Sequence, residues 1–533
     1  MTRVNTHTIE FIGMDLGTTT SQVSIIDSAG NVQVLPNIDG DLSTPSVVSG
    51  AEAKPTVGKV AKQDKFLNAV AVAEQFKKLM GTVTENGDHI PVVTGLDGTE
   101  YTAVMASAIL LRYLKDGAEK LSGRPIKKAV ISVPAYFKRV ARQATKEAGQ
   151  IAGFDEVLIV DEPTAAATYY GLSKGKNQIL VVVDLGGGTL DVSILKITAD
   201  GSIDPDALDG DPECGGSNVD EALFQLAREF VEKKGGKLDP EEDLAEWLEV
   251  LEHCKQAKEM LARKDKAIIP LRVGNERFSM EVTYDQMKES CADVIDTIRN
   301  CCQRALAKAS LSASEIDSVV LVGGSSRLRF VAKIVKDVFG QEPVTDTDPD
   351  MAVVKGNAIL AAAHFSTSDR PLLIGGKVYL TSVIKTSQIA GRVLCSAMVT
   401  KKEEGDLNEY NYPIIPSGAK LPYDAIEYFS PLDPRQSSVL IKLIDGPAGE
   451  LSSHFTPLQE AEVSVQPTTE AKNNDRIKFT IKMDTEGMVD ITVRDKVLNK
   501  PVPINFKYHT KLSDADIRKQ RDQLKKRHGD IDD

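Results

Sequence analysis

The residues best suited to chemistry in this sequence are glycines and threonines that recur together in two short segments. Residues 15–20 read DLGTTT, and residues 184–189 read DLGGGT. Glycines and small hydroxyl residues leave backbone N–H groups uncovered, so an anion can approach the chain closely. The two segments therefore predict two phosphate-binding turns, with contacts from Gly17, Thr18, Thr19 and Thr20 in the first and from Gly186, Gly187, Gly188 and Thr189 in the second.

An aspartate begins each of these turns. Asp15 and Asp184 would repel a phosphate by themselves, so they make sense only together with a cation. The expected cation is Mg²⁺, held through its water shell. Two such turns that face each other would hold one polyphosphate between them. The sequence therefore predicts a two-lobed clamp for Mg·ATP.

Each turn lies between two apolar, β-branched runs, which is the pattern of a strand, a tight turn and a strand. Residues 10 to about 365 alternate such runs with helical patterns, as α/β proteins do. A polar stretch and a glycine pair break this pattern around residues 366–376, and the short alternating strands beyond predict an all-β sandwich. A last helix is expected from Ser513 to about His528, with Asp516 at the capping-box spacing.

These patterns divide the chain into four parts. At 533 residues it is too long for one hydrophobic core. We expect a nucleotide-binding domain over residues 1–369, an interdomain linker over residues 370–376, a β-sandwich domain over residues 377–511 and a short helix, the remnant of a larger helical element, over residues 512–533.

Charge and composition exclude several classes of protein. A formal net charge of −13 and a pI near 5.3 argue against a nucleic-acid partner. No stretch approaches the ~20 apolar residues that a membrane span requires, and the N-terminus lacks the apolar core of a signal peptide. The six cysteines form no CxxC pair and are expected to be free thiols. We therefore expect a cytoplasmic protein that binds proteins and small molecules.

Further short motifs accompany the two turns in a fixed order. They are FKKLMG at residues 76–81, VPAYF at 133–137, DEPTAAA at 161–167, a glycine pair at 215–216, VGGSSR at 322–327 and DPD at 348–350. Each motif is weak alone, but in this order they closely resemble those of the 70-kDa heat-shock chaperones of the DnaK type. The resemblance extends to about Arg521 and is strongest within residues 10–365.

The resemblance implies a nucleotide-binding domain of the actin-like, ribonuclease-H-like kind, with two lobes around a deep cleft that binds ATP or ADP with Mg²⁺. It implies that Lys77 reaches the γ-phosphate and the attacking water, with Glu162, Asp184 and Thr189 as further catalytic residues. Such a site suits phosphoryl transfer, which needs positive charge and positioning more than covalent chemistry. The other nucleotide contacts would come from Gly215, Gly216, Lys255, Lys258, Gly323, Gly324, Ser325, Arg327 and Asp350.

The resemblance also implies a chaperone cycle. In the family, residues matching Pro134, Arg142 and Lys146 belong to a relay that couples the nucleotide to the linker, whose apolar centre here contains Leu372 and Leu373. The implied partners are a J-domain co-chaperone, a nucleotide-exchange factor and unfolded or extended peptide segments. Neither a nucleic acid nor a membrane is implied.

Several positions depart from the family pattern. Glu259 stands where the family has an arginine that stacks on the base, and a carboxylate cannot supply that contact. Lys138 and Arg139 replace polar or acidic residues and are interpreted as a solvated helix start, and Asp191 as a strand residue that faces solvent. The sequence ends where the family's helical lid begins, so we expect a short, lidless member.

Two functions stay open at this point. The leading hypothesis is a chaperone that slowly hydrolyses Mg·ATP to modulate contacts with proteins or peptides. The alternative is a regulatory or scaffold member that binds ATP only structurally and forms a stable complex with a J-domain co-chaperone, in one branch of the family on the ribosome. Asp15, Lys77, Glu162 and Asp184 are all present and favour hydrolysis. A sugar or acetate kinase on the same fold would need an acceptor pocket and an aspartate base, for which the sequence gives no signal.

Overall fold

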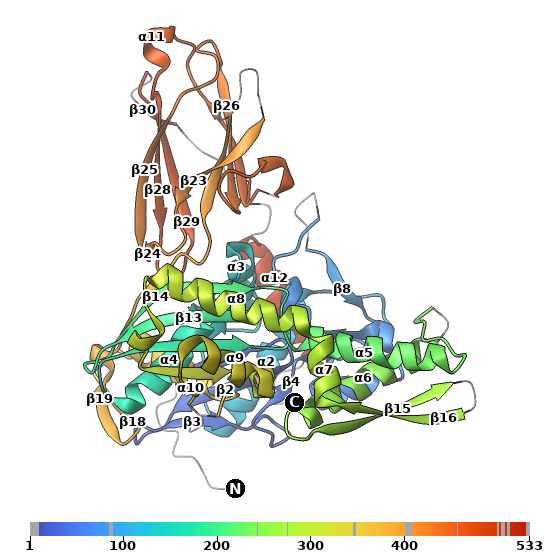
Figure 1. Cartoon of the computed structure of the whole chain (residues 1–533). Coiled ribbons are helices and arrows are strands. Elements are labelled where there is room, and N and C mark those ends of the chain that lie inside the picture. Colours follow the sequence, from blue (N-terminus) through green and yellow to red (C-terminus); the bar gives the residue numbers. More distant parts are fainter. Residues whose placement is uncertain are drawn as a thin grey trace.

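The structure is a computed structural model of the chain, and it describes residues 10–84, 89–241, 243–273, 276–344, 348–399, 408–455, 457–497, 500–502, 507–508 and 512–528. Figure 1 shows a broad α/β part and a narrower β-rich part that stands on it. Among the described residues, no helix combines the length and the apolar character needed to span a membrane.

One mixed sheet carries the first predicted turn. Its central strand β1 (Phe11–Leu16) pairs in parallel with β10 (Lys128–Val133) and antiparallel with β2 (Thr20–Ile26), and the order is β11-β10-β1-β2-β3. The turn at residues 17–19 therefore joins two neighbouring strands, as predicted. The other strands of this sheet are β3 (Val32–Leu35), β4 (Thr44–Pro45) and β11 (Glu156–Asp161).

A second mixed sheet carries the second turn in the same way. Its strand β12 (Gln178–Leu185) pairs in parallel with β17 (Ser318–Val322) and antiparallel with β13 (Leu190–Ile197), in the order β17-β12-β13-β14-β20. The same connection of strand, glycine turn and strand thus occurs twice, each time with a parallel strand beside the first. The sheet is completed by β14 (Ser202–Asp211) and β20 (Lys385–Thr386).

Two helices lie between the sheets. They are α4 (Glu162–Lys174) and α10 (Ala352–Phe365), and their apolar residues share one core with Val130 of the first sheet and Val182 of the second. The helices pack closely, because a β-carbon at Gly356 would lie 1.8 Å from the carbonyl oxygen of Ala165. This shared core fixes the position of one glycine turn relative to the other.

Further helices cover the outer faces of the two sheets. The first sheet packs on α2 (Ala103–Ser122) and α3 (Arg139–Ile151). The second forms a core with α5 (Gly216–Lys233), α6 (Leu244–Leu261), α8 (Ala292–Ala309) and α9 (Arg329–Phe339), and also with the hairpin of β15 (Lys266–Val273) and β16 (Glu276–Thr283). Shorter elements are α1 (Lys59–Asp64), α7 (Tyr284–Ser290), β5 (Val47–Ser49), β6 (Thr56–Val57), β7 (Val72–Glu74), β8 (Pro91–Thr94) and β9 (Glu100–Thr102).

The β-rich part is the predicted sandwich. One sheet has the order β23-β22-β26-β27-β31 and the other β25-β28-β29-β30. Ile441 of the first sheet and Phe479 and Val493 of the second lie in one core. The strands are β22 (Leu394–Val399), β23 (Glu409–Ile415), β25 (Tyr423–Phe429), β26 (Ser438–Asp445), β27 (Gln459–Ser464), β28 (Ile477–Met483), β29 (Val489–Asp495), β30 (Lys500–Val502) and β31 (Lys507–Tyr508).

Residues 370–376, predicted as the linker, lie in a hairpin on the α/β part. β18 (Pro371–Ile374) pairs with β19 (Lys377–Leu380), and Leu372 is fully buried in the core that contains α4 and α10, whereas Leu373 is 41% exposed. The apolar side chains of the hairpin hold it on the α/β part, and β20 still pairs there with β14. The chain crosses after residue 386, where β21 (Gln388–Ile389) pairs with β24 (Lys420–Leu421).

The last helix, α12 (Asp514–His528), agrees with the predicted range. The side chain of Ser513 and the carboxylate of Asp516 form the predicted capping box. The helix lies against α3 (Figure 1): Leu524 is buried in the core beneath α3, and Arg521 Nη2 donates to the carbonyl oxygen of Gly153 over 3.0 Å.

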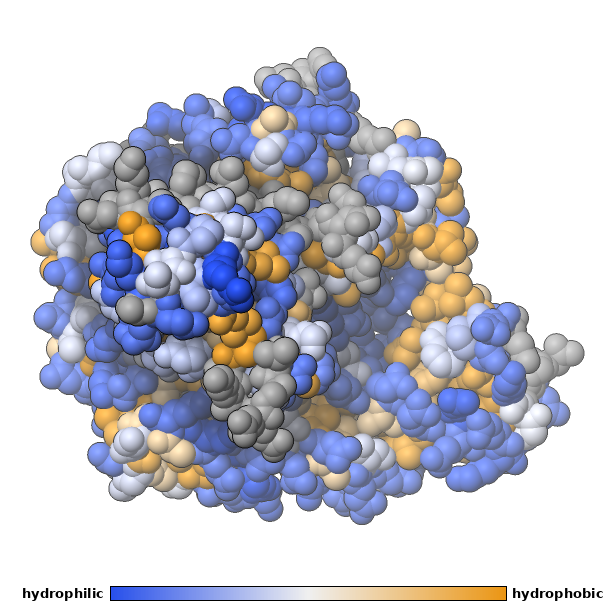
Figure 2. All heavy atoms as spheres, turned by 90° about the horizontal axis from the view of Figure 1, so that it is seen from above, coloured by the Kyte–Doolittle hydropathy of each residue, from blue (hydrophilic) through white to orange (hydrophobic). Residues whose placement is uncertain are grey.

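Seen from above, the surface is mainly hydrophilic, with apolar residues in small groups (Figure 2). The β-rich part nevertheless has several exposed apolar side chains. Ile426 and Tyr428 lie two residues apart on the outer side of β25 and are 52% and 43% exposed. Leu440 of β26 is 51% exposed. This part therefore offers apolar surface to a partner.

Candidate functional site

The two glycine turns lie face to face. A β-carbon at Gly187 would be only 2.6 Å from Cγ2 of Thr19, so only glycine allows this approach. The first turn is held by Ser46, whose hydroxyl donates to the carbonyl oxygen of Gly17 over 2.7 Å. The second is closed by a hydrogen bond from Gly186 N–H to the carbonyl oxygen of Thr189.

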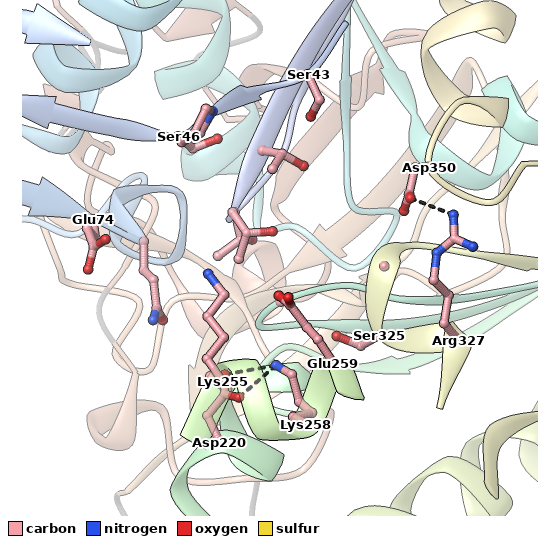
Figure 3. Close-up of a pocket in the computed structure, with 18 of the residues that line it drawn as sticks. Ser43, Ser46, Glu74, Asp220, Lys255, Lys258, Glu259, Ser325, Arg327 and Asp350 are labelled. Carbon is pink, nitrogen blue, oxygen red and sulfur yellow. Dashed lines mark hydrogen bonds and ion pairs between the residues drawn. The ribbon is translucent and has the colours of Figure 1, made fainter. Parts of the chain in front are cut away.

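A cavity of about 910 Å³ opens above these turns. Its volume lies within the range of small-molecule sites in proteins. The predicted residues that line it are Thr18, Thr19, Thr20, Gly187, Lys255, Lys258, Gly324, Ser325, Arg327 and Asp350. Sequence positions far apart are thus brought to one cavity, and Figure 3 shows several of them from α6 and from the segment after β17 pointing into it.

A buried cluster of charged residues lies beside the turns. Lys77, on a short 3-10 helix (Phe76–Leu79), donates to Glu162 Oε1 over 2.6 Å, and both side chains are buried. Glu162 begins α4 directly after β11, where Pro163 suits the first turn of a helix. Asp15 accepts a hydrogen bond from the hydroxyl of Ser132. The predicted catalytic Lys77 and Glu162 are therefore in contact, and the carboxylate of Asp184 is close enough to raise the pKa of Lys77.

Burial, followed by repulsion from the Glu162 carboxylate, raises the pKa of Asp15 to about 7, although the ammonium of Lys77 acts in the opposite direction. Burial, followed by repulsion from Glu162, Asp191 and Asp15, holds the pKa of Asp184 well above its usual range. For Lys77, burial disfavours the charged form, but the surrounding carboxylates outweigh it and raise the pKa of the ammonium. The cluster therefore has more acid than one lysine can neutralise.

Asp191 belongs to this cluster, and its interpretation as a solvent-facing residue is wrong. It is 1% exposed and pairs across the hairpin with Asp184, because β12 and β13 place the two residues opposite each other. Cross-strand partners point to the same face of a sheet. Its Oδ1 accepts from Tyr136 N–H over 3.0 Å, whereas its Oδ2 is buried without a hydrogen-bond partner in the described structure.

The acidic cluster fits a hydrated divalent cation. Asp15, Asp184 and Asp191 supply carboxylate oxygens beside the phosphate turns, and an unpartnered buried oxygen on Asp191 leaves capacity for a further donor or cation. In the described part of the chain, no three His, Cys, Asp or Glu side chains are arranged as direct metal ligands. Mg²⁺ commonly keeps several of its waters and needs few protein ligands.

The predicted glycine pair holds the second turn. Gly215 precedes α5, and the N–H of Gly216 donates to the carbonyl oxygen of Gly186. Lys258 of α6 donates to the carbonyl oxygen of Gly216 over 3.1 Å and pairs with Asp220. Gly188 lies against Gly215, since a β-carbon at Gly215 would be 2.5 Å from Cα of Gly188.

The opposite wall follows strand β17. Gly323, with a φ of 80°, turns the chain beside Asp184, where a β-carbon would lie 2.5 Å from the carboxylate. Gly324, Ser325 and Arg327 come next, and Arg327 Nη2 donates to Asp348 over 2.9 Å and to Asp350 over 2.7 Å. This wall therefore presents a guanidinium that two carboxylates hold in place, and Figure 3 shows its contact with Asp350.

The predicted relay residues lie between the site and the β-rich part. Pro134 opens the turn after β10, and Arg142 of α3 pairs with Asp161, the residue before Glu162. Lys146 donates to Glu486 of the sandwich over 2.7 Å. Of the three, Lys146 contacts the β-rich part directly.

Arg139 is a contact residue, and its interpretation as part of a solvated helix start is wrong. Its Nη1 donates to Asp445 Oδ1 over 2.6 Å, and the pair is largely buried between α3 and the sandwich. Arg392, on the crossing segment, donates to the carbonyl oxygen of Tyr136. Tyr136 is therefore hydrogen-bonded both to Asp191 of the acidic cluster and to the segment that leads into the β-rich part.

Comparison with known proteins agrees with this arrangement. The chain is 32% identical to the chaperone protein DnaK of Thermosipho melanesiensis over 527 residues, which are 97% of this chain and 83% of that protein. It is 33% identical to the chaperone protein DnaK of Thermotoga neapolitana, with the same coverage of both chains. A model of the family described as Hsp70 protein matches residues 11–530. The chain therefore belongs to the Hsp70 family.

Proposed function

We propose that the chain is an ATP-dependent chaperone that binds Mg·ATP in the cavity and slowly hydrolyses it. The observation that carries this proposal is the contact of Gly187 with Thr19 at the base of the cavity. It brings the uncovered backbone of two glycine turns to one place, where a triphosphate can be bound from both sides.

The residues beside the turns suit phosphoryl transfer. Asp15 and Asp184 would hold hydrated Mg²⁺, and this ion supplies positive charge to the phosphates when it is bound. Lys77 places a second positive charge beside them, and Glu162 fixes its ammonium by the 2.6 Å hydrogen bond. Thr189 closes the second turn through its carbonyl oxygen. These residues orient the phosphates and neutralise their charge, which is most of what this reaction requires.

We propose that the state of the nucleotide reaches the β-rich part through Tyr136. Its N–H is held by Asp191, in the acidic cluster, and its carbonyl oxygen by Arg392. A cation bound in the cluster changes the charge around Asp191 and with it the position of this turn. Arg142 and Lys146 of α3 extend the connection to Asp161 and to Glu486.

The β-rich part would contact unfolded or extended peptide segments. Its exposed Ile426, Tyr428 and Leu440 give it the apolar surface for such contacts. Among the described residues, α12 packs on α3 and leaves these three side chains exposed, so we propose that they contact the peptide directly. A J-domain co-chaperone and a nucleotide-exchange factor are the proposed partners, and the cytoplasm the proposed location, where the free cysteines would stay reduced.

The alternative is a scaffold that binds ATP without hydrolysis and stays in complex with a J-domain co-chaperone. The ion pairs Arg139–Asp445 and Lys146–Glu486 favour it to the extent that they hold the two parts together at all times. Hydrolysis is favoured by the complete charged cluster, which consists of Lys77, Glu162, Asp15 and Asp184. We therefore prefer the hydrolysing chaperone to the scaffold.

The chaperone function is tested by fluorescence anisotropy of a labelled, unfolded apolar peptide, with and without Mg·ATP. We expect the affinity or the dissociation rate of the peptide to change with ATP in the wild-type chain. The variant Lys146→Ala loses one connection between the parts and should respond less, whereas Lys120→Ala, at an exposed position on α2, should respond like the wild type. A peptide affinity and dissociation rate that do not change with ATP would contradict the proposed coupling.

A further inference from the structure

Strand β2 places one neutral amide, that of Gln22, beside the acidic cluster. The antiparallel pairing of β1 with β2 sets Gln22 opposite Asp15, and cross-strand partners point to the same face of a sheet. Gln22 also lines the cavity, together with Thr18 and Thr20 of the first phosphate turn. Its side chain therefore lies where the cavity meets one of the two carboxylates proposed to hold the cation.

The oxygen of this amide has no partner. Gln22 is only 4% exposed, and its Oε1 is buried without a hydrogen-bond partner in the described structure. A buried polar atom that stays unpaired costs free energy, so such an atom in a binding site is expected to meet its partner when the ligand is bound. Because an amide oxygen is an acceptor, the missing partner is an N–H or O–H donor.

The charged groups around Asp15 do not supply this donor. Asp15 itself is a carboxylate, and the ammonium of Lys77 already donates to Glu162. The oxygens of a phosphate are acceptors as well. The waters around Mg²⁺ differ, because the ion binds each water by its oxygen and leaves two O–H groups to donate outward. Mg²⁺ usually keeps several such waters, so a hydrated ion beside Asp15 would bring donors within reach of Gln22.

We propose that the side-chain oxygen of Gln22 accepts a hydrogen bond from a hydration water of the Mg²⁺ that Asp15 helps to hold. This inference rests on the proposed function, since it requires Mg²⁺ beside a bound nucleotide. Gln22 is then a positioning residue, which orients the water shell from the side of β2. As a neutral group it adds an acceptor without adding negative charge to the crowded carboxylates of Asp15, Asp184 and Asp191.

The inference is tested by calorimetric binding of ADP, which is not consumed during the measurement, to the full chain with Mg²⁺ and with a chelator. The ratio of the two affinities reports how strongly the hydrated ion binds beside the nucleotide. Gln22→Met nearly keeps the length of the side chain and removes the acceptor. We expect this variant to lower the ratio roughly 10- to 100-fold, as other losses of a group that orients metal ligands do. Its affinity for ADP without Mg²⁺ should equal that of the wild type.

Two further variants separate this role from a structural one. Gln22→Glu keeps an acceptor at the same place and should keep the ratio at or above the wild-type value. Gln33→Met makes the same change as Gln22→Met on β3 of the same sheet, where Gln33 donates to Asp27, and should leave the ratio unchanged.

Two results would overturn the inference alone. One is a ratio that Gln22→Met leaves unchanged. The other is an equal loss of ADP affinity with and without Mg²⁺, since Gln22 would then contact the nucleotide or support the fold. A wild-type chain that binds no ADP, or binds it equally well with and without Mg²⁺, would overturn the proposed Mg·ATP site as well.

Discussion

Arg139 of α3 and Asp445 at the end of β26 form an ion pair of 2.6 Å that joins the α/β part to the sandwich. The backbone N–H of Arg139 donates to the same carboxylate. The side chains are only 11% and 3% exposed, so the loss of one partner would leave a buried charge without compensation. The contact between the two parts therefore depends on both residues.

Reversing one charge of this pair should separate the two parts. For Arg139→Glu or Asp445→Arg we expect the free energy that holds the two parts together to fall by about 3–5 kcal/mol. The doubly reversed variant should regain this free energy. Small-angle scattering would report the separation as a larger radius of gyration. The exposed pair Arg435–Asp433 provides the control, since Arg435→Glu should leave the radius unchanged. A single reversal that leaves the parts together would show that this ion pair is dispensable.

A β-carbon on the second turn should push the two turns apart. Gly187→Ala places a methyl group 2.6 Å from Thr19, and we expect a loss of about tenfold or more in ATP affinity, measured by calorimetry. Gly117→Ala is the matched control, because its β-carbon meets nothing closer than 3.4 Å and alanine favours a helix by about 1 kcal/mol. Unchanged binding in Gly187→Ala would argue against phosphates between the turns.

The acidic cluster should make stability depend on pH when no cation is bound. Burial, followed by repulsion from the Glu162 carboxylate, raises the pKa of Asp191 from its ordinary value of 3.8 to about 7. The folded chain then binds more protons at this site than the unfolded chain, so the free energy of unfolding falls as pH rises from about 4 to about 7.

Asp191→Asn removes this titration and keeps an oxygen that can accept from Tyr136 N–H. Its stability relative to the wild type should therefore rise between about pH 5 and about pH 8, by at most about 1.4 kcal/mol per pH unit. Urea unfolding in the presence of a chelator measures the difference. The same relative stability at both pH values would mean that Asp191 does not titrate in this range.

The packing of α12 on α3 depends on Leu524. Leu524→Ser replaces a buried apolar side chain with a hydroxyl, and we expect faster amide exchange in α12 and in the part of α3 that it covers. Gln523→Ser changes the exposed neighbouring residue and should leave the exchange as it is. If the two variants exchange alike, α12 is not held by this contact.

Much of the site could be predicted because its chemistry is local. The glycine and threonine turns, the strands beside them and the start of α4 at Glu162 follow from short sequence patterns. The position of Asp191 beside Asp184 could also be predicted, because a tight turn at residues 186–189 places the two residues opposite each other. The strand pattern alone, without the register of the hairpin, indicates a carboxylate that faces solvent.

Other features depend on how distant segments meet. Arg139 and Asp445 are 306 residues apart, and nothing near either one indicates the other. Gly375 and Gly376 were interpreted as the break of a linker, but they form the turn between β18 and β19. Leu372 and Ile374 both point to the buried face of the hairpin. This pattern can be explained only when α4 is known to lie beneath that face.

Single-turnover hydrolysis of ATP with Mg²⁺ tests the central proposal most directly. The wild-type chain should hydrolyse bound ATP well above background, and Lys77→Ala should lose about tenfold to 1,000-fold of that rate, because a buried positive charge beside the phosphates is removed. Lys120→Ala, on the exposed side of α2, should hydrolyse like the wild type. Identical rates near background for the wild type and Lys77→Ala would contradict hydrolysis and favour ATP as a structural ligand.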